Sequence, residues 1–446
     1  MTVVAFIIGI VLLVVGLAVS IALHELGHML PAKKFGVRVG QYMIGFGPTL
    51  WSRRRGETEY GVKAIPLGGY ISMAGMYPPS PAKADGSAGR AGRAGGGFFA
   101  TMVQDARAAN DLTLETDDDP RVFYRLPVWK RVVVMLGGPF MNLVLAIVLF
   151  TILLSGIGVQ AATTTIDSVS ECVIPSGEQR TACEASDPAA PAAQAGLQPG
   201  DVLVSVAGQP VDTFAESSAI VRESAGQTIP VVVERDGDEV TLRLTPTAVS
   251  VPETDAAGQV VTDAEGDPVM TEVGYAGMRA QLAYVPQPIW SGAEATFAQV
   301  GAVAGIVWKL PAMVWDTAVA TVTGQERDPN GPLSVVGAGV LAGEVAASDQ
   351  PVLNRISGLL GLLASLNVAL FVFNLIPLLP LDGGHVAVAL WDGTKRVWAK
   401  LTDRPSPKPV DATKLVPVTF VVVVALIAMG AVLIISDLVN PISLLG

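Results

Sequence analysis

The chain has 446 residues, of which 50% are hydrophobic and only 15% are charged. Soluble globular proteins usually have about 25% charged residues, so this composition argues against a soluble enzyme and favours a membrane protein. The formal net charge of −11, with no concentrated basic face interleaved with aromatic residues, argues against a nucleic-acid partner.

The first predicted element is an apolar helix from Val3 to about Leu30, long enough to cross about 30 Å of hydrocarbon. It has no basic segment before it and is too long for a signal peptide, so we expect it to remain in the protein. Further spans are predicted over Val132–Val159 and Leu415–Ile435. A fourth apolar stretch, from about Ile356 to Leu381, is interrupted by prolines.

Two segments follow the first span. Residues 37–75 alternate apolar and polar side chains between glycines, which predicts a short β-meander that lies against the membrane. Residues 79–120 are rich in Ala, Gly and charged side chains, which predicts a flexible insertion. The glycine-rich part of this insertion has no preceding strand and no GK[ST], so it is not a phosphate-binding loop.

The segment after the second span contains AAQAGLQPGDVLVSVAGQPV, a helical stretch from Phe214 to Ser224 and two predicted strands, IPVVVERDG and DEVTLRLTP. This pattern, over about residues 160–247, resembles a PDZ domain. The resemblance implies a module that binds peptide C-termini or extended segments by strand addition. An unrelated β-rich domain is the alternative.

The same segment contains the only two cysteines, Cys172 and Cys183. Outside the cytoplasm such a pair is typical of a disulfide, with two free thiols or a separate metal site as alternatives. Further along, residues 287–325 are apolar enough to resemble a span. Lys309 and Pro311 argue against full burial, so we predict helices on the outer membrane surface, with a re-entrant segment as the alternative.

Charges in the connecting segments predict the orientation. Residues 29–126 have 13 Lys and Arg, whereas residues 158–352 have seven against 25 Asp and Glu. Residues 391–414 again have more Lys and Arg, six against three Asp. The positive-inside rule places the first and third of these segments in the cytoplasm, and both termini and the PDZ-like domain outside it.

The first span ends in HELGH, in which His24, Glu25 and His28 match H-E-x-x-H. Residues four apart on a helix project from nearly the same face, so both imidazoles can bind one zinc ion. Glu25 lies beside them, where it can act as a general base toward the attacking water. Polar helix-end residues that reach for the membrane interface are the alternative interpretation.

A catalytic zinc usually has a third protein ligand. The segment NLIPLLPLDGGH, Asn374 to His385, contains an aspartate and the third histidine of the chain. Its prolines and glycines interrupt the helix, and irregular backbone within a membrane is tolerated where it is buried in protein or lines a wet cavity. On chemistry alone, either Asp382 or His385 could complete the site.

HELGH in a first span, together with N-x-x-P-x-x-x-L-D-G near a later one, resembles the site-2 proteases, which are intramembrane zinc metalloproteases. The GFGP…PLGGY and GGPFMN sequences extend this resemblance over nearly the whole chain. It implies His24, His28 and Asp382 as zinc ligands and Glu25 as the general base. It also implies that Asn374 and Pro377 help to hold the substrate strand, and that Asn142 of GGPFMN lies near the catalytic core and belongs to the substrate-binding residues. His385 is not a usual ligand in this family.

The resemblance implies a bacterial cytoplasmic-membrane enzyme that cleaves single-span membrane proteins, such as anti-sigma factors or signal-peptide remnants, after a site-1 protease has trimmed them. Two other classes of function remain as alternatives: a catalytically silent membrane scaffold that uses the PDZ-like domain, and a zinc transporter or sensor. Retention of Glu25 argues against the scaffold. Three polar sites near one membrane face, rather than a relay across it, argue against transport.

The predicted fold class is a polytopic α-helical membrane protein with four transmembrane segments, a membrane-associated β-meander and an extracytoplasmic PDZ-like α+β domain. The expected organisation is, in order, 1–31 first transmembrane helix, 32–78 β-meander, 79–126 cytoplasmic insertion, 127–159 second transmembrane helix, 160–247 PDZ-like domain, 248–352 linker and surface helices, 353–390 third transmembrane segment, 391–414 cytoplasmic loop and 415–438 fourth transmembrane helix.

Overall fold

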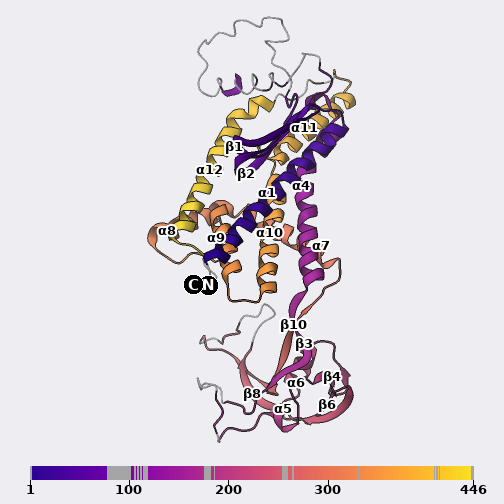
Figure 1. The fold of residues 1–446 in the computed structure, drawn as a ribbon, viewed down its shortest axis with the longest axis vertical. Helices are drawn as coiled ribbons and strands as arrows, with labels where there is room; N and C mark the ends of the chain where they lie inside the picture. The colour runs from indigo at the N-terminus through magenta and orange to yellow at the C-terminus, as the bar shows by residue number, and fades with distance from the viewer. Residues whose placement is uncertain are drawn as a thin grey trace, which may run out of the picture. The chain divides into compact units, whose positions relative to one another are not determined.

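The computed structural model describes most of the chain, namely residues 3–77, 102–104, 107, 110, 113, 119–174, 182–184, 186–253, 260–263, 266–329, 331–405, 407, 410 and 412–442. Most of the predicted insertion, 79–126, therefore lies outside the described residues. The chain forms two compact units, one of residues 1–157 with 288–446, and one of residues 158–287. We call them the helical unit and the inserted unit and describe each by itself (Figure 1).

Four helical segments in the helical unit are long and apolar enough to cross a membrane, which confirms the predicted fold class. They are α1 (Val3–Lys34), α4 (Val128–Thr151) with the π-helical turn η2 (Ile152–Ile157), α10 (Val352–Asn374), and η3 (Ala412–Leu415) with α12 (Val416–Val439). The chain is therefore a multi-pass membrane protein.

A fifth apolar region consists of α7 (Ser291–Val307) and α8 (Leu310–Thr323), which meet at a bend of 71°. By length and composition this pair is a broken span or a re-entrant loop. Trp308, at the bend, is 89% exposed. The predicted position of these helices on the outer membrane surface stays a prediction.

Helices α1 and α4 cross very closely. A Cβ atom at Gly27 would overlap the carbonyl oxygen of Gly137, and a Cβ at Gly137 would overlap that of Gly27. Small residues allow helix backbones to approach in this way within a membrane, where close van der Waals packing favours association. The crossing places the HELGH sequence of α1 against the GGPFMN sequence of α4.

Strands β1 (Val39–Arg55) and β2 (Thr58–Met73) form a sheet where the β-meander was predicted, and its position against the membrane stays a prediction. Both strands bend, so each contributes two segments to the pairing. Residues 69–73 pair with 39–44, residues 41–44 also pair with 59–62, and residues 59–62 pair in turn with 51–54. Segment 69–73 therefore forms one edge of the sheet, and Gly69 lies against the side chains of Ile21 and Glu25 on α1.

The remaining elements of the helical unit are shorter. They are η1 (Phe123–Arg125), α9 (Val335–Ala347) and α11 (Asp382–Leu401). α9 contacts α1, and α12 contacts α8 and α9. The end of α12 is held there by a buried ion pair between Arg327 and Asp437, whose second oxygen accepts a hydrogen bond from the Ser334 N–H at 2.7 Å.

The inserted unit is an α+β domain with its own hydrophobic core. Its main sheet has the order β10-β3-β4-β6-β7, with β5 paired to β4, and a separate hairpin joins β8 and β9. The elements are β3 (Val159–Val169), α5 (Pro191–Gln194), β4 (Val202–Val206), β5 (Gln209–Pro210), α6 (Phe214–Glu223), β6 (Ile229–Arg235), β7 (Asp238–Leu244), β8 (Thr247–Pro252), β9 (Met270–Tyr275) and β10 (Met278–Val285). Helix α6 and strands β6 and β7 occupy the positions that the sequence predicts, whereas the PDZ assignment itself stays a prediction.

The two cysteines are joined in the inserted unit. Cys172 and Cys183 form a disulfide with their Cα atoms 5.9 Å apart, and Cys172 also makes an isolated β-bridge with Ala189. A Cα separation of this size is typical of disulfides. The geometry is thus compatible with the expectation of a disulfide outside the cytoplasm.

An ion pair between a buried carboxylate and a partly exposed arginine joins the turn before β4 to β6. Asp201, which is 1% exposed, accepts hydrogen bonds from Arg235 Nε at 2.7 Å and Nη2 at 2.8 Å, and from the Gln198 N–H at 2.9 Å. The Arg235 guanidinium, and then the Gln198 N–H, hold the pKa of the Asp201 carboxyl below its ordinary value, although burial acts in the opposite direction.

We expect Asp201→Asn to lower the free energy of unfolding of the inserted unit by about 2 kcal/mol at pH 7, because hydrogen bonds to an ionised group are lost. A folded-state pKa below the unfolded value of about 3.9 makes this contribution present above pH 4 and lost as the pH falls further. Urea unfolding of the 158–287 segment between pH 3 and pH 7 measures both effects. Exposed Asp167→Asn is the control, and an equal loss in both variants at pH 7 would contradict the assignment.

Candidate metal centre

Three side chains from two distant helices meet near the α1–α4 crossing. His24 Nε2 and His28 Nε2 lie 3.2 Å apart, and Asp382 Oδ2 lies 3.2 Å from the first and 3.3 Å from the second. His24 and His28 come from α1, one helical turn apart, and Asp382 is the first residue of α11. Among the described residues, these three form the one His, Cys, Asp and Glu group that could hold a metal ion.

The geometry of these three atoms fits zinc. Zinc–nitrogen and zinc–oxygen bonds of about 2.0–2.1 Å in a tetrahedron separate the ligand atoms by about 3.3 Å, close to the distances between these atoms. Asp382 Oδ2 is buried and accepts no hydrogen bond from the described residues. Two imidazole nitrogens and one carboxylate oxygen are the ligand set of many catalytic zinc sites, so the arrangement fits a bound zinc ion.

Glu25 is next to this group. It follows His24 in α1, is 9% exposed, and its Cγ lies against Gly69 at the edge of the β1–β2 sheet. Tyr42 of β1 donates a hydrogen bond of 2.6 Å to the carbonyl oxygen of Ala22, which lies one helical turn before Glu25 in α1. Burial, and then the charge of Glu25, raise the pKa of Tyr42 to about 12. The phenol therefore stays a neutral donor that ties the sheet to α1.

Helix α4 orients both histidines. His28 Nδ1 lies 2.8 Å from the carbonyl oxygen of Val134, to which Nδ1–H donates a hydrogen bond, and this leaves Nε2 free to bind a metal. His24 Nδ1 lies 3.1 Å from the side-chain amide of Asn142. A His24 that binds through Nε2 has its proton on Nδ1, so we assign the Asn142 amide with its oxygen toward that proton.

The other residues of the sequence prediction lie apart from the three ligand atoms. Asn374 ends α10, and its Nδ2 donates a hydrogen bond of 2.9 Å to Leu370 O in the same helix. Pro377 lines an apolar cavity of about 410 Å³ between the α10–α11 connection and α12. His385, one turn after Asp382, stacks on Tyr77 with ring centroids 6.3 Å apart. Substrate binding by Asn374, Pro377 and Asn142 therefore stays a prediction.

Two residues that position the histidines of the candidate metal centre were not identified from the sequence. Val134 acts through its carbonyl oxygen, which no side-chain pattern reveals. Gly138 lies against the imidazole of His28, so that a Cβ atom at this position would overlap the ring. GGPFMN was recognised only through the family resemblance, although a glycine pair within an apolar helix is itself a signal of close helix packing.

Known proteins are similar to this chain in sequence. Residues 12–403 match the family model described as Peptidase family M50. The chain belongs to peptidase family M50. It is 36% identical to zinc metalloprotease Rip1 of Mycobacterium tuberculosis H37Rv, over 98% of this chain and 99% of the relative. Identity to zinc metalloprotease Rip1 of Mycolicibacterium smegmatis is 35% over 98% of both chains, and to metalloprotease MmpA of Caulobacter vibrioides 28% over 88% of both.

Membership of family M50 supports zinc as the cofactor and metalloprotease as the enzyme class. It also confirms the resemblance on which the sequence assignment rested. The ligand roles of the three side chains rest on their geometry. His385 remains outside the metal-binding group, which leaves Asp382 as the candidate third ligand.

We expect Gly138→Ala to displace the His28 ring and to weaken zinc binding by at least tenfold, because the added methyl group overlaps Nε2. Competition for zinc between the purified protein and a coloured chelator measures the change. Gly430→Ala on α12 is the matched control, since a Cβ there meets nothing within 4 Å. Unchanged affinity in Gly138→Ala would exclude His28 as a ligand in this position.

We expect Asn142→Leu to weaken zinc binding about 10- to 100-fold, as is usual when the hydrogen-bond acceptor of a metal-bound histidine is removed. Asn142→Asp keeps an acceptor for the His24 Nδ1 proton and should retain affinity near that of the wild type. The same chelator competition compares the two. A loss of equal size in both variants would contradict the proposed amide orientation.

Proposed function

We propose that this protein is an intramembrane zinc endopeptidase that cleaves single-span membrane proteins. The observation that supports this most directly is that His24 and His28, on a helix long and apolar enough to span a membrane, meet Asp382 of α11. Glu25 lies beside them on the same helix as the histidines. Ionisable residues at such depth are costly and usually functional. Membership of family M50 supplies the reaction class.

The residues of the candidate metal centre have different roles in peptide hydrolysis. His24, His28 and Asp382 would hold zinc, which when bound supplies a Lewis acid that activates water and polarises the scissile carbonyl. The Glu25 carboxylate accepts a proton from the attacking water and then donates it to the nitrogen of the leaving amine. Val134 O and Asn142 hold the two imidazoles in the tautomer that leaves each Nε2 free.

A helical substrate must unwind before its carbonyl can react, because its backbone groups are hydrogen-bonded within the helix. Segment 69–73 of β2 is an edge of its sheet and lies beside Glu25 through Gly69. Among the described residues its outer side pairs with no strand. We propose that the unwound substrate adds to this edge as a further strand, so that backbone hydrogen bonds hold it next to the general base.

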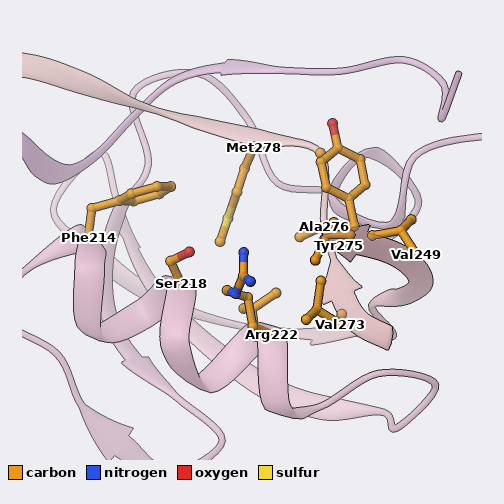
Figure 2. A pocket seen from close by; sticks show the side chains of 12 residues that line it. Phe214, Ser218, Arg222, Val249, Val273, Tyr275, Ala276 and Met278 are labelled. Atoms are coloured by element: carbon orange, nitrogen blue, oxygen red, sulfur yellow. The ribbon is translucent and has the colours of Figure 1, made fainter. Parts of the chain in front are cut away.

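The inserted unit supplies a second candidate contact with substrates. A cavity of about 180 Å³ lies between α6 and the β8–β9–β10 region, with Phe214, Ser218 and Arg222 along one side (Figure 2). Strand β10 is an edge of the main sheet and begins at this cavity with Met278. An edge strand beside an apolar cavity suits extended segments or peptide C-termini, as the PDZ resemblance implies.

We propose that this unit lies outside the cytoplasm, on the side opposite the Lys- and Arg-rich segments. It would then contact the outer part of a substrate and admit those already shortened by a site-1 protease. Anti-sigma factors and signal-peptide remnants are substrates of this type. The acidic composition of the inserted unit, with 19 Asp and Glu against five Arg in residues 158–287, supports this side of the membrane.

We expect Glu25→Gln to lower cleavage of a tagged single-span substrate with a shortened outer domain by about 10²- to 10⁴-fold, because the general base is lost. Zinc content should stay unchanged, since Glu25 is not a proposed ligand. Glu57→Gln, at a partly exposed position of the β1–β2 turn, is the matched control and should cleave like the wild type, because a surface ion pair with Arg121 contributes little.

Quantitative immunoblotting of the cut fragment in reconstituted membranes gives the rate, and chelation of zinc should stop the wild-type reaction. Equal cleavage by Glu25→Gln and the wild type would refute the catalytic assignment. If neither form cut the substrate although each bound one zinc ion per chain, a membrane scaffold would become the better description.

A further inference from the structure

Helix α11 has an exposed surface that the proposed reaction does not use. Its N-terminal half packs into the protein, where Gly383 and Gly384 lie against the backbone of residues 375–379. Further along, one face presents large apolar side chains that are between 53% and 76% exposed. They are Leu390, Trp391, Val397, Trp398 and Leu401.

This part of α11 lies level with the start of a membrane span. Asp392 Oδ2 accepts a hydrogen bond of 3.0 Å from Arg131 Nη1, and both side chains are buried. Arg131 is in the first turn of α4, beside Trp129 and Lys130. Trp and Lys at the end of a span typically mark the lipid headgroup region. The exposed face of α11 therefore lies beside the end of a candidate span, where a headgroup region is expected.

A cavity of about 450 Å³ opens next to this face. Its apolar walls are the two tryptophans at 391 and 398, and its cationic groups are Lys395 and Arg404. Lys395 also contacts Asp392 at 3.3 Å, and Arg404 is exposed at the end of the helix. The surrounding segment, 391–414, has six Lys and Arg against three Asp. Apolar walls beside two cations complement a ligand that is anionic at one end and apolar at the other.

We propose that this cavity binds an anionic phospholipid, with its phosphate at Arg404 and Lys395 and its acyl chains along Trp391 and Trp398. Basic residues near a membrane surface attract anionic headgroups, and tryptophan suits the boundary between headgroups and acyl chains. Since α11 begins at Asp382, a lipid bound here would lie on the same rigid helix as a proposed zinc ligand. The lipid site does not depend on the proposed protease function.

The test uses the full-length protein in mixed micelles with equal amounts of phosphatidylglycerol and phosphatidylcholine, and native mass spectrometry counts the bound lipids. We expect phosphatidylglycerol to bind in excess, and Arg404→Gln to reduce that excess about fivefold, as for one cation near a membrane surface. Arg396→Gln is the matched control, because it removes the same charge from an exposed position on α11 outside the cavity.

Trp398→Ala should also reduce the bound phosphatidylglycerol, whereas Val397→Ala, exposed on the same face but outside the cavity, should not. Equal binding of the two lipids by the wild type would mean apolar contact only and would overturn the proposal. An equal loss of bound phosphatidylglycerol in Arg404→Gln and Arg396→Gln would mean that the overall positive charge attracts the lipid, and would overturn the proposed site. None of these readouts requires cleavage, so failure of the proposed protease function would leave the lipid result intact.

Discussion

The close crossing of α1 and α4 is the constraint on which the candidate metal centre depends. Gly27 and Gly137 leave no room for a side chain between the two backbones. At this separation the Val134 carbonyl reaches His28, and the Asn142 side chain reaches His24. A wider crossing would leave both imidazoles without these partners and free to rotate. The glycines therefore help to orient the proposed zinc ligands, because they allow the two helices to approach closely.

Buried polar groups at other positions of the helical unit also form hydrogen bonds or ion pairs between helices. Asn367, fully buried on α10, donates a hydrogen bond of 3.0 Å to Ser20 on α1, one turn before His24. Arg131 pairs with Asp392 between α4 and α11. Polar groups within a membrane are costly unless they are paired, and a pair between helices is satisfied in one relative position only. These contacts thus define how α1, α10 and α11 align.

Much of this arrangement was predictable from the sequence, because its signals are local. The four spans follow from the length and composition of apolar stretches, and the pair of histidines from a spacing of four residues on one helix. Whether Asp382 or His385 is the third ligand could not be predicted from local sequence signals. Both follow the same broken stretch, and which of them faces α1 depends on how the start of α11, with Gly383 and Gly384 against residues 375–379, packs in the folded protein. The Val134 carbonyl and the bent β1–β2 pairing likewise depend on tertiary contacts.

One face of α4 contacts both histidines of the candidate centre and also helix α11. Arg131, Val134, Gly138 and Asn142 are separated by three, four and four residues, a spacing that puts them on the same side of a helix. In order, they contact the Asp392 carboxylate of α11, the Nδ1–H group of His28, the His28 ring and His24. The two ligands on α1 and the helix that begins at Asp382 are therefore positioned against a single rigid element. A rotation of α4 about its axis would disturb both histidines and α11 together, whereas a rotation of α12, which contacts α8 and α9, would leave these contacts in place.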